Sequence, residues 1–179
     1  MIENSSRDVL TGKAMARTIE RLAYEVLERH GECQDLVILG IQRRGVDLGA
    51  RLQKILEKCL KRDIPLGKLD INLYRDDWSR MEQQPVINES DIPCSIDERE
   101  VLLVDDVLFT GRTVRAALEA ILDFGRPRRV ELLVLVDRGH WELPIHADFV
   151  GKLVEAQRGQ HVNVLLKERD GHDKVCLVG

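Results

Sequence analysis

The segment Val101–Thr113 constrains the fold and the chemistry of this 179-residue chain more than any other segment. It starts with the apolar run Val101–Val104, which is typical of a strand covered on both faces of a sheet. Two adjacent acids, Asp105 and Asp106, interrupt this run, and the turn Thr110–Thr113 then precedes a predicted helix. Two neighbouring carboxylates at a sheet edge are costly unless cations or hydroxyl groups meet them. The segment therefore predicts a ligand site at the end of a buried strand.

The Thr-Gly-Arg-Thr turn at residues 110–113 offers hydroxyl groups and the free N–H groups of a helix N-terminus, which favour an anion. Gly111 allows the backbone to approach a ligand closely. A sugar phosphate, with a phosphate at one end and hydroxyl groups at the other, fits the turn and the acids together. Taken singly, the acid pair is also typical of a capped turn, and the Thr-Gly-x-Thr turn of a simple N-cap. Their succession after an apolar strand favours a ligand site.

Strands and helices alternate along the rest of the chain. Apolar or alternating segments predict strands over Asp35–Gly40, Leu69–Tyr74, Val101–Val104, Val130–Val136, His146–Val150 and Val162–Leu166. Helical periodicity predicts helices from the N-cap Thr11 to His30, over Val46–Leu60 and over Thr113–Phe124. The charged segment Arg75–Asp91 is predicted to be a long loop or an extended β-arm. The pattern predicts one α/β domain over residues 1–179, with a central, mostly parallel sheet flanked by helices.

In such a sheet, ligands bind at the carboxyl ends of the strands. Three polar segments follow predicted strands and are expected to meet there: Gln42–Gly45, Asp105–Thr113 and Asp137–His140.

Composition excludes several other classes of protein. The formal net charge is -4, although the first 62 residues carry 12 basic and 9 acidic residues, so the whole chain lacks the basic footprint of a nucleic-acid binder. The four cysteines form no C-x-x-C pair, which leaves no zinc or redox motif. No apolar run reaches the roughly 18 residues of a membrane span, and residues 1–10 lack the apolar core of a secretory signal. We expect a cytoplasmic protein without a membrane partner.

The segment Val101–Thr113 resembles the phosphoribosyl pyrophosphate (PRPP) signature of type I phosphoribosyltransferases. The order and spacing of further segments resemble the PyrR family, bifunctional pyrimidine-operon regulators with uracil phosphoribosyltransferase activity: Gly40–Gly45, Asp70–Asp77, Gly125–Pro127 and Val136–Asp148. The resemblance spans about Leu10 to Leu177. It implies a type I phosphoribosyltransferase fold with a flexible β-arm and a small hood, at about residues 137–160 plus the N-terminal segment. It also implies conversion of uracil and PRPP to UMP and pyrophosphate, with Mg²⁺, in a homodimer or higher homo-oligomer.

The resemblance assigns roles to particular residues of this sequence. Asp105 and Asp106 would be the catalytic acids that hold the ribose hydroxyls, with Mg²⁺ nearby on PRPP and no direct protein ligand. The PRPP-binding residues would be Val104, Val107, Leu108, Phe109, Thr110, Gly111, Arg112 and Thr113. The pyrophosphate loop would be Gln42, Arg43, Arg44 and Gly45, and the flexible loop would include Tyr74, Arg75 and Asp76. Uracil would meet Val136, Asp137 and Arg138.

The family's second role is UMP-dependent binding to pyrimidine-operon leader mRNA, which attenuates transcription. Candidate RNA contacts are Lys13, Arg17, Arg21, His140 and Lys152, with Arg158 as a further one. The chain departs from the family pattern at Trp141 and His146, where arginine is expected, at Tyr24, where histidine is expected, and at Glu20 within the basic stripe. Losing guanidinium groups removes the phosphate contacts that dominate RNA affinity.

Three alternatives stay open. One is an RNA-binding regulator with negligible catalysis, the second a salvage enzyme that has lost RNA binding, and the third a phosphoribosyltransferase that acts on a purine.

Overall fold

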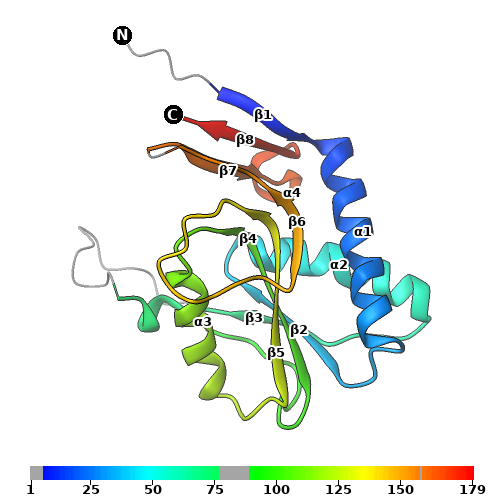
Figure 1. Ribbon diagram of the computed structural model, residues 1–179. Coiled ribbons are helices and arrows are strands. Elements are labelled where there is room, and N and C mark those ends of the chain that lie inside the picture. Colours follow the sequence, from blue (N-terminus) through cyan, green and yellow to red (C-terminus); the bar gives the residue numbers. More distant parts are fainter. Residues whose placement is uncertain (1–5, 77–88, 158) are drawn as a thin grey trace.

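The computed structural model describes residues 6–76, 89–157 and 159–179. Its centre is a five-stranded parallel sheet in the order β3-β2-β4-β5-β6 (Figure 1). These strands are β2 (Leu36–Ile41), β3 (Leu66–Leu69), β4 (Glu100–Leu108), β5 (Arg129–Asp137) and β6 (Phe149–Leu153). The principal helices are α1 (Gly12–His30), α2 (Arg44–Leu60) and α3 (Arg112–Leu122). The prediction of an α/β fold with a central parallel sheet is confirmed.

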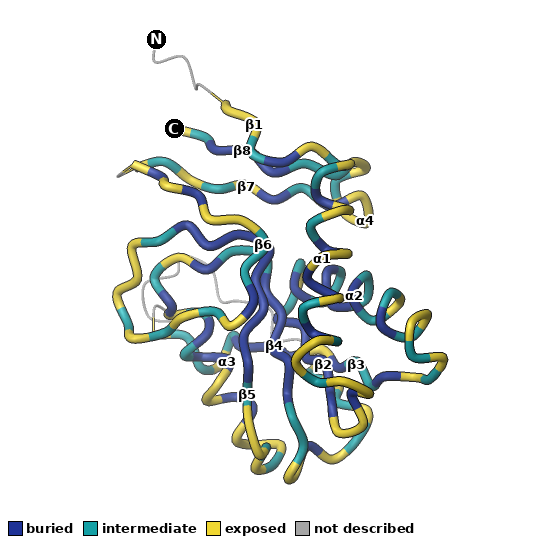
Figure 2. Tube along the Cα trace, turned by 45° about the vertical axis from the view of Figure 1, so that its right-hand side comes forward, coloured by how far each residue is buried: buried dark blue, intermediate teal, exposed yellow. Residues whose placement is uncertain are grey.

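Both faces of the sheet are buried, which explains the continuous apolar runs in its strands. On one face, Ile38, Leu102 and Val104 pack with apolar residues of α1 and α2. On the other face, Val37 and Leu103 pack with apolar residues of α3. Figure 2 shows the resulting core of buried strands between helices whose outer sides are exposed. Among the described helices, none is long and apolar enough to cross a membrane.

A second, antiparallel sheet joins the two ends of the chain in the order β1-β8-β7 (Figure 1). It consists of β1 (Ser6–Thr11), β7 (His161–Leu165) and β8 (Lys174–Val178), and the short helix α4 (Lys167–Asp170) connects β7 to β8. The sequence analysis missed β1, β8 and α4. These segments are short, and β1 is exposed over most of its length, so their hydrophobic patterning is weak. The division into a core and a hood stays a prediction.

The N-terminus of α1 was predicted correctly: the Thr11 hydroxyl accepts a hydrogen bond from the Ala14 N–H at 3.3 Å.

The predicted strand Leu69–Tyr74 is wrong, because β3 ends where that strand was expected to begin. The Asp70 carboxylate accepts a hydrogen bond from the Asn72 N–H at 2.8 Å, which turns the chain into the 3₁₀ helix η1 (Asn72–Tyr74).

Two further boundaries differ from the prediction. The acids do not interrupt β4, because its pairing with β5 includes Asp105 and continues beyond Asp106 to the pair Leu108–Asp137. The predicted strand His146–Val150 is displaced, since β6 begins at Phe149. The Asp148 carboxylate instead accepts the Leu132 N–H at 2.9 Å, which holds the chain beside β5 before β6 starts.

Gly45 allows the first turn of α2 to lie directly against the end of β4. A β-carbon at this position would stand 2.3 Å from the Val104 carbonyl oxygen and 3.3 Å from the Asp105 Cα. Both obstacles are backbone atoms, so they cannot rotate away. The absence of a side chain here therefore determines how closely the loop before α2 approaches the two acids.

We expect Gly45→Ala to push α2 away from β4 and to lower both thermal stability and activity. Gly49→Ala is the matched control in the same helix, because its β-carbon would meet only side-chain atoms, at 3.1 and 3.4 Å. Replacing a helical glycine by alanine favours the helix by about 1 kcal/mol, so the control should be neutral or more stable. Thermal unfolding of both variants measures the difference, and equal melting temperatures would contradict this account of Gly45.

Candidate active site

The carboxylates of Asp105 and Asp106 lie near the end of β4, and Asp105 is buried while Asp106 is half-buried. Asp105 accepts the Asp106 N–H at 2.9 Å, and Asp106 accepts the Val107 N–H at 2.9 Å. Burial raises the pKa of Asp105 well above its ordinary value, and the neighbouring charge of Asp106 adds to the rise. Burial also raises the pKa of Asp106, although the positive charge of Arg44 opposes part of that rise. The pair therefore favours a cationic partner or hydroxyl donors.

The predicted phosphate turn lies between β4 and α3. Gly111 is the N-cap of α3 with a φ of 88°, a left-handed conformation that favours glycine. The Thr110 hydroxyl accepts the Arg112 N–H at 3.4 Å, and the Thr110 carbonyl accepts the Glu142 N–H at 3.0 Å. A cavity of about 260 Å³ opens over this turn, lined by Arg75, Asp76, Phe109, Thr110, Arg112 and Thr113. The turn thus combines hydroxyl groups, a helix N-terminus and a cavity, as an anion site requires.

Arg112 connects this turn to two other segments. Its guanidinium forms ion pairs with Asp76 at 2.6 Å and with Glu142 at 2.9 Å. The Arg115 guanidinium donates to the Tyr74 carbonyl, so α3 also holds the end of η1. The predicted flexible-loop residues Tyr74, Arg75 and Asp76 therefore lie beside the phosphate turn. The remainder of the predicted arm, residues 77–88, lies outside the described residues.

The predicted pyrophosphate loop lies between β2 and α2, and the peptide bond between Gln42 and Arg43 is cis. A cavity of about 470 Å³ adjoins it, lined by Gln42, Arg43, Val46, Asp47, Lys68, Glu89, Asp91 and Arg169. Arg44 forms an ion pair with Asp170 at 3.3 Å, and its charge also acts on Asp106. The loop is therefore cationic and lies against the acid pair, as a leaving-group site would require.

The residues predicted to hold the base are Val136 and Asp137, the last two of β5, and Arg138, which follows them. The Arg138 N–H donates to the Leu108 carbonyl at 2.9 Å, which brings the ends of β4 and β5 together. The Arg138 guanidinium stacks on Phe109, with its central carbon 3.7 Å from the ring centroid. Arg138 is only 6% exposed, its Nε has no hydrogen-bond partner among the described residues, and burial lowers its pKa. Its desolvated N–H groups favour a ligand that accepts hydrogen bonds.

One carboxylate oxygen of Asp137 is engaged by the segment that follows β5. Its Oδ1 accepts the Gly139 N–H at 2.8 Å and the Trp141 Nε1–H at 3.1 Å. Trp141 also packs edge-on against His146, with ring centroids 4.4 Å apart. Two of the four positions at which the chain departs from the family pattern, Trp141 and His146, are therefore in contact with each other in the segment after β5.

The candidate RNA contacts lie on α1, on β6 and in the segment that follows β5. Lys13, Arg17 and Lys152 are exposed. Arg21 is engaged within the protein, because it donates to the Val150 and Gly151 carbonyls at 3.1 and 2.6 Å and pairs with Glu25. His140 lies 2.8 Å from the Ala156 carbonyl oxygen through its Nε2. The side chain of Arg158 lies outside the described residues.

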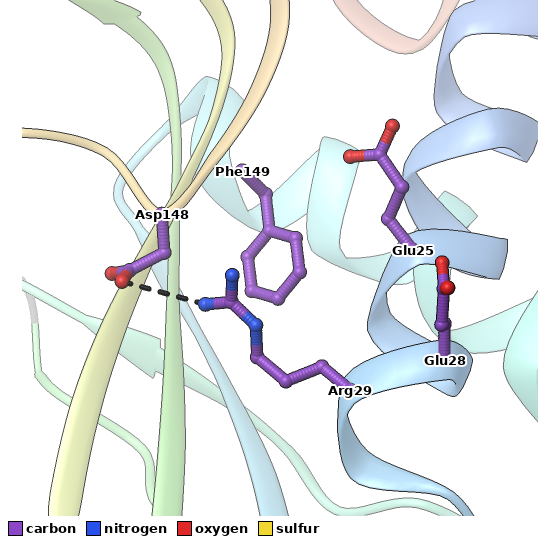
Figure 3. A pocket seen from close by; sticks show the side chains of 5 residues that line it. All are labelled: Glu25, Glu28, Arg29, Asp148 and Phe149. Atoms are coloured by element: carbon purple, nitrogen blue, oxygen red, sulfur yellow. Dashed lines mark hydrogen bonds and ion pairs between the residues drawn. The ribbon is translucent and has the colours of Figure 1, made fainter.

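A further cavity of about 310 Å³ lies between α1 and the start of β6 (Figure 3). Its lining residues are Glu25, Glu28, Arg29, Asp148 and Phe149. Arg29 stacks on the Phe149 ring and pairs with Glu131 at 2.9 Å and Asp148 at 3.5 Å. Three carboxylates and one paired guanidinium line this cavity, and Arg29 lies in the last turn of α1, where the helix dipole disfavours an anion. The cavity is therefore a poor site for a phosphate.

Sequence reasoning missed Lys68, Glu142 and Arg169, which line or brace the two cavities beside the acid pair. Lys68 and Arg169 come from segments without a recognisable motif, whereas Glu142 lies in the segment Val136–Asp148 but was given no role. Arg169 is separated by more than 120 residues from Arg43, whose carbonyl it contacts. The spacing along the chain carries no signal of this proximity. Only the pairing of α4 with α2 in the fold reveals it.

Comparison with known proteins agrees with this geometry. The model of the family "Phosphoribosyl transferase domain" matches residues 5–169. A "Bifunctional protein PyrR" from Syntrophobacter fumaroxidans is 49% identical over 99% of this chain and 95% of its own. The PyrR proteins of Enterococcus faecalis and Desulfosudis oleivorans are 47% and 51% identical, over 96% and 94% of both chains.

Solved structures confirm the fold. A hypoxanthine phosphoribosyltransferase of Trypanosoma cruzi superposes with a TM-score of 0.74 at 16% identity, covering 100% of this chain and 94% of its own. A hypoxanthine-guanine phosphoribosyltransferase of Bacillus anthracis gives a TM-score of 0.71 at 15% identity, covering 99% and 100%. Identities this low support the type I phosphoribosyltransferase fold alone. The near full-length identity to the PyrR proteins is more specific, and the chain belongs to the PyrR family of phosphoribosyltransferases.

Proposed function

We propose that this chain transfers the 5-phosphoribosyl group of PRPP to uracil, yielding UMP and pyrophosphate, and that UMP controls its binding to pyrimidine-operon leader mRNA. One observation carries the enzymatic half: two desolvated carboxylates lie at the end of β4, between a phosphate-type turn and a cationic loop. A pentose with a phosphate at carbon 5 and a pyrophosphate at carbon 1 matches this order of groups. Membership of the PyrR family supports uracil as the base.

The residues of the chain act by position and charge. The turn Thr110–Thr113 holds the 5-phosphate with backbone N–H and hydroxyl groups, and the loop Arg43–Gly45 receives the pyrophosphate. Asp105 and Asp106 accept hydrogen bonds from the ribose hydroxyls. As the bond to pyrophosphate breaks, positive charge develops on the ribose, and the two carboxylates stabilise that charge without forming a covalent bond. Catalysis therefore needs no protein nucleophile.

The acid pair also fits the Mg²⁺ that phosphoribosyltransferases use. Within the described residues, no group of three or more His, Cys, Asp and Glu side chains could hold a metal ion by itself. Mg²⁺ prefers one or two carboxylates and completes its shell with substrate oxygens and water. Asp105 and Asp106 supply carboxylate oxygens of this kind beside the predicted substrate. When bound, the ion would neutralise part of the charge of the PRPP oxygens.

The base side of the site favours a base with carbonyl oxygens. Arginine is a hydrogen-bond donor only, and uracil presents acceptor oxygens. Phe109 holds the Arg138 guanidinium in place, and the buried guanidinium has no ion-pair partner among the described residues. Binding of uracil would satisfy donors whose desolvation is otherwise uncompensated.

The regulatory half of the proposal is supported by exposed cations that lie outside the catalytic cavities. Lys13 and Arg17 are exposed on α1, and Lys152 is exposed on β6. Lys152 and Arg7 also line a groove of about 570 Å³ between β1 and the end of β6. Cations in such a position can meet RNA phosphates. Oligomeric state and cytoplasmic location stay predictions.

Asp106→Asn should lower kcat by about a hundredfold or more, because it removes charge that stabilises the developing cation. The same variant should unfold at a higher temperature than the wild type at neutral pH without substrate. About 1 kcal/mol of relieved repulsion corresponds to 2–4 °C in a chain of this size. Asp63→Asn, at an exposed position, is the control. Unchanged kinetics in Asp106→Asn would refute the site assignment.

The stability gain of Asp106→Asn should depend on pH. Because the folded-state pKa values of both acids are raised, the folded protein binds more protons than the unfolded chain between the ordinary and raised pKa values. Stability of the wild type therefore decreases as pH rises through this window. The advantage of the variant should be complete above the raised pKa values and should shrink as pH falls toward about 4. Thermal unfolding of both proteins over this pH range measures the difference in melting temperature. A difference that does not change with pH would contradict the prediction.

Arg138→Met should raise the KM for uracil roughly tenfold or more, as expected for the loss of a charged hydrogen bond, while the KM for PRPP changes little. Methionine keeps an apolar stem that can pack on Phe109, so the loop should stay in place. Arg126→Met is the control, because Arg126 is exposed and precedes β5, whereas Arg138 follows it. Steady-state kinetics with each substrate varied separately would decide, and an equal rise in both constants would argue against a base contact.

Lys152→Ala and Arg17→Ala should each weaken UMP-dependent binding to leader RNA and reduce the salt dependence by roughly one phosphate contact. Lys54→Ala, exposed on α2, should leave both unchanged. Gel-shift titrations at several salt concentrations, with and without UMP, measure these effects. Identical behaviour of all three variants would place the RNA elsewhere on the protein.

A further inference from the structure

The short helix α4 carries a side chain that contacts the predicted pyrophosphate loop from the opposite end of the sequence. The Arg169 Nη2 donates to the Arg43 carbonyl at 3.3 Å, and its Nε and Nη2 both reach the Asp47 carboxylate. Asp47 lies in the first turn of α2, and Arg43 is the N-cap of that helix. One guanidinium thus holds both the last peptide of the loop and the first turn that follows it.

We propose that Arg169 is a positioning residue for the pyrophosphate half of the reaction, an inference that rests on the proposed phosphoribosyltransferase function. The Arg43 side chain makes no capping hydrogen bond at the start of α2, so the orientation of this loop depends on contacts from outside the helix. The Arg43 carbonyl accepts the Val46 N–H at 3.2 Å and the Arg169 guanidinium. Arg169 is therefore the distant contact that fixes this peptide.

The charge of Arg169 supports a positioning role over direct binding of pyrophosphate. Its guanidinium is paired with Asp47, whose side chain is 16% exposed, so the pair carries no net charge toward the cavity. Direct binding would require Arg169 to leave both Asp47 and the Arg43 carbonyl. Arg43 and Lys68, which line the same cavity, are cations from the loop and from β3.

The segment that carries Arg169 is itself held firmly against α2. Arg51 of α2 pairs with Glu168 at 2.5 Å and with Asp173 at 2.6 Å, on either side of Arg169 in the sequence. Asp170 pairs with Arg44 at 3.3 Å and also accepts the Leu166 N–H at 2.8 Å. The two successive residues Arg169 and Asp170 therefore contact the two successive arginines of the loop. Such bracing matters because a displacement of about 1 Å can cost a hundredfold in rate.

The test compares Arg169→Ala, Arg169→Lys and Asp47→Ala with Arg62→Ala. Arg62 is the matched control, because its guanidinium also donates to backbone carbonyls, those of Glu32 and Gln34, but follows the C-terminal end of α2. We expect Arg169→Ala to raise the KM for PRPP and the inhibition constant of pyrophosphate by roughly tenfold, with less than a twofold change in the KM for uracil. Arg169→Lys should recover part of the loss, since one ammonium can keep one of the two contacts.

A double-variant cycle separates positioning from direct binding. If Arg169 acts with Asp47 on the loop, the variant that lacks both side chains should be no worse than Arg169→Ala alone. Fully additive effects, an unchanged KM for PRPP, or an equal effect of Arg62→Ala would each overturn the proposal. Calorimetric titration with pyrophosphate gives the same comparison without turnover. If the wild type forms no UMP, the proposed function fails; if it forms UMP and Arg169→Ala behaves as wild type, this inference alone fails.

Discussion

The burial of two adjacent carboxylates at the end of β4 is the constraint on which the rest of the site depends. β4 pairs with β5 at Asp105 and again at Val107, so the backbone fixes both acids at the carboxyl end of the sheet. Burial raises the pKa of both acids, so the charged form of each carboxylate costs the folded chain stability. A protein tolerates such a cost where a cationic transition state or a metal–substrate complex relieves it, because stability is then exchanged for function.

The groups that surround the acids come from separate parts of the fold. The absence of a side chain at Gly45 allows the cationic loop to lie against Val104. The left-handed conformation of Gly111 allows the phosphate turn to lead directly into α3. Hydrogen bonds from the Arg138 and Glu142 N–H groups to the carbonyls of Leu108 and Thr110 place the segment after β5 next to that turn. The loops that follow β2, β4 and β5 thus lie at one end of the sheet around the acid pair, as expected for a ligand site in a parallel α/β sheet.

The sequence predicted the sheet, its three principal helices and the convergence of those loops, because continuous apolar strands and capped helices carry strong local signals. It failed where a side-chain contact overrode local pattern. Asp70 bends the chain out of the strand expected over Leu69–Tyr74, and Asp148 delays the start of β6. Arg169 and Glu142 could not be assigned, because their roles arise from contacts between segments that are distant in the sequence. The PRPP motif was found because it is contiguous.

The arrangement of β5 and β6 gives the two halves of the function a short physical connection. Val136 and Asp137, at the base side of the site, are paired with Lys152 and Leu153 of β6. The Asp137 carbonyl accepts the Val154 N–H at 2.9 Å, while the Asp137 carboxylate holds Gly139 and Trp141. Dependence of RNA affinity on UMP requires only that the nucleotide contacts this segment differently in the two states of the protein. Because the predicted base contacts and an exposed cation share one pair of strands, no long pathway through the core is needed to link them.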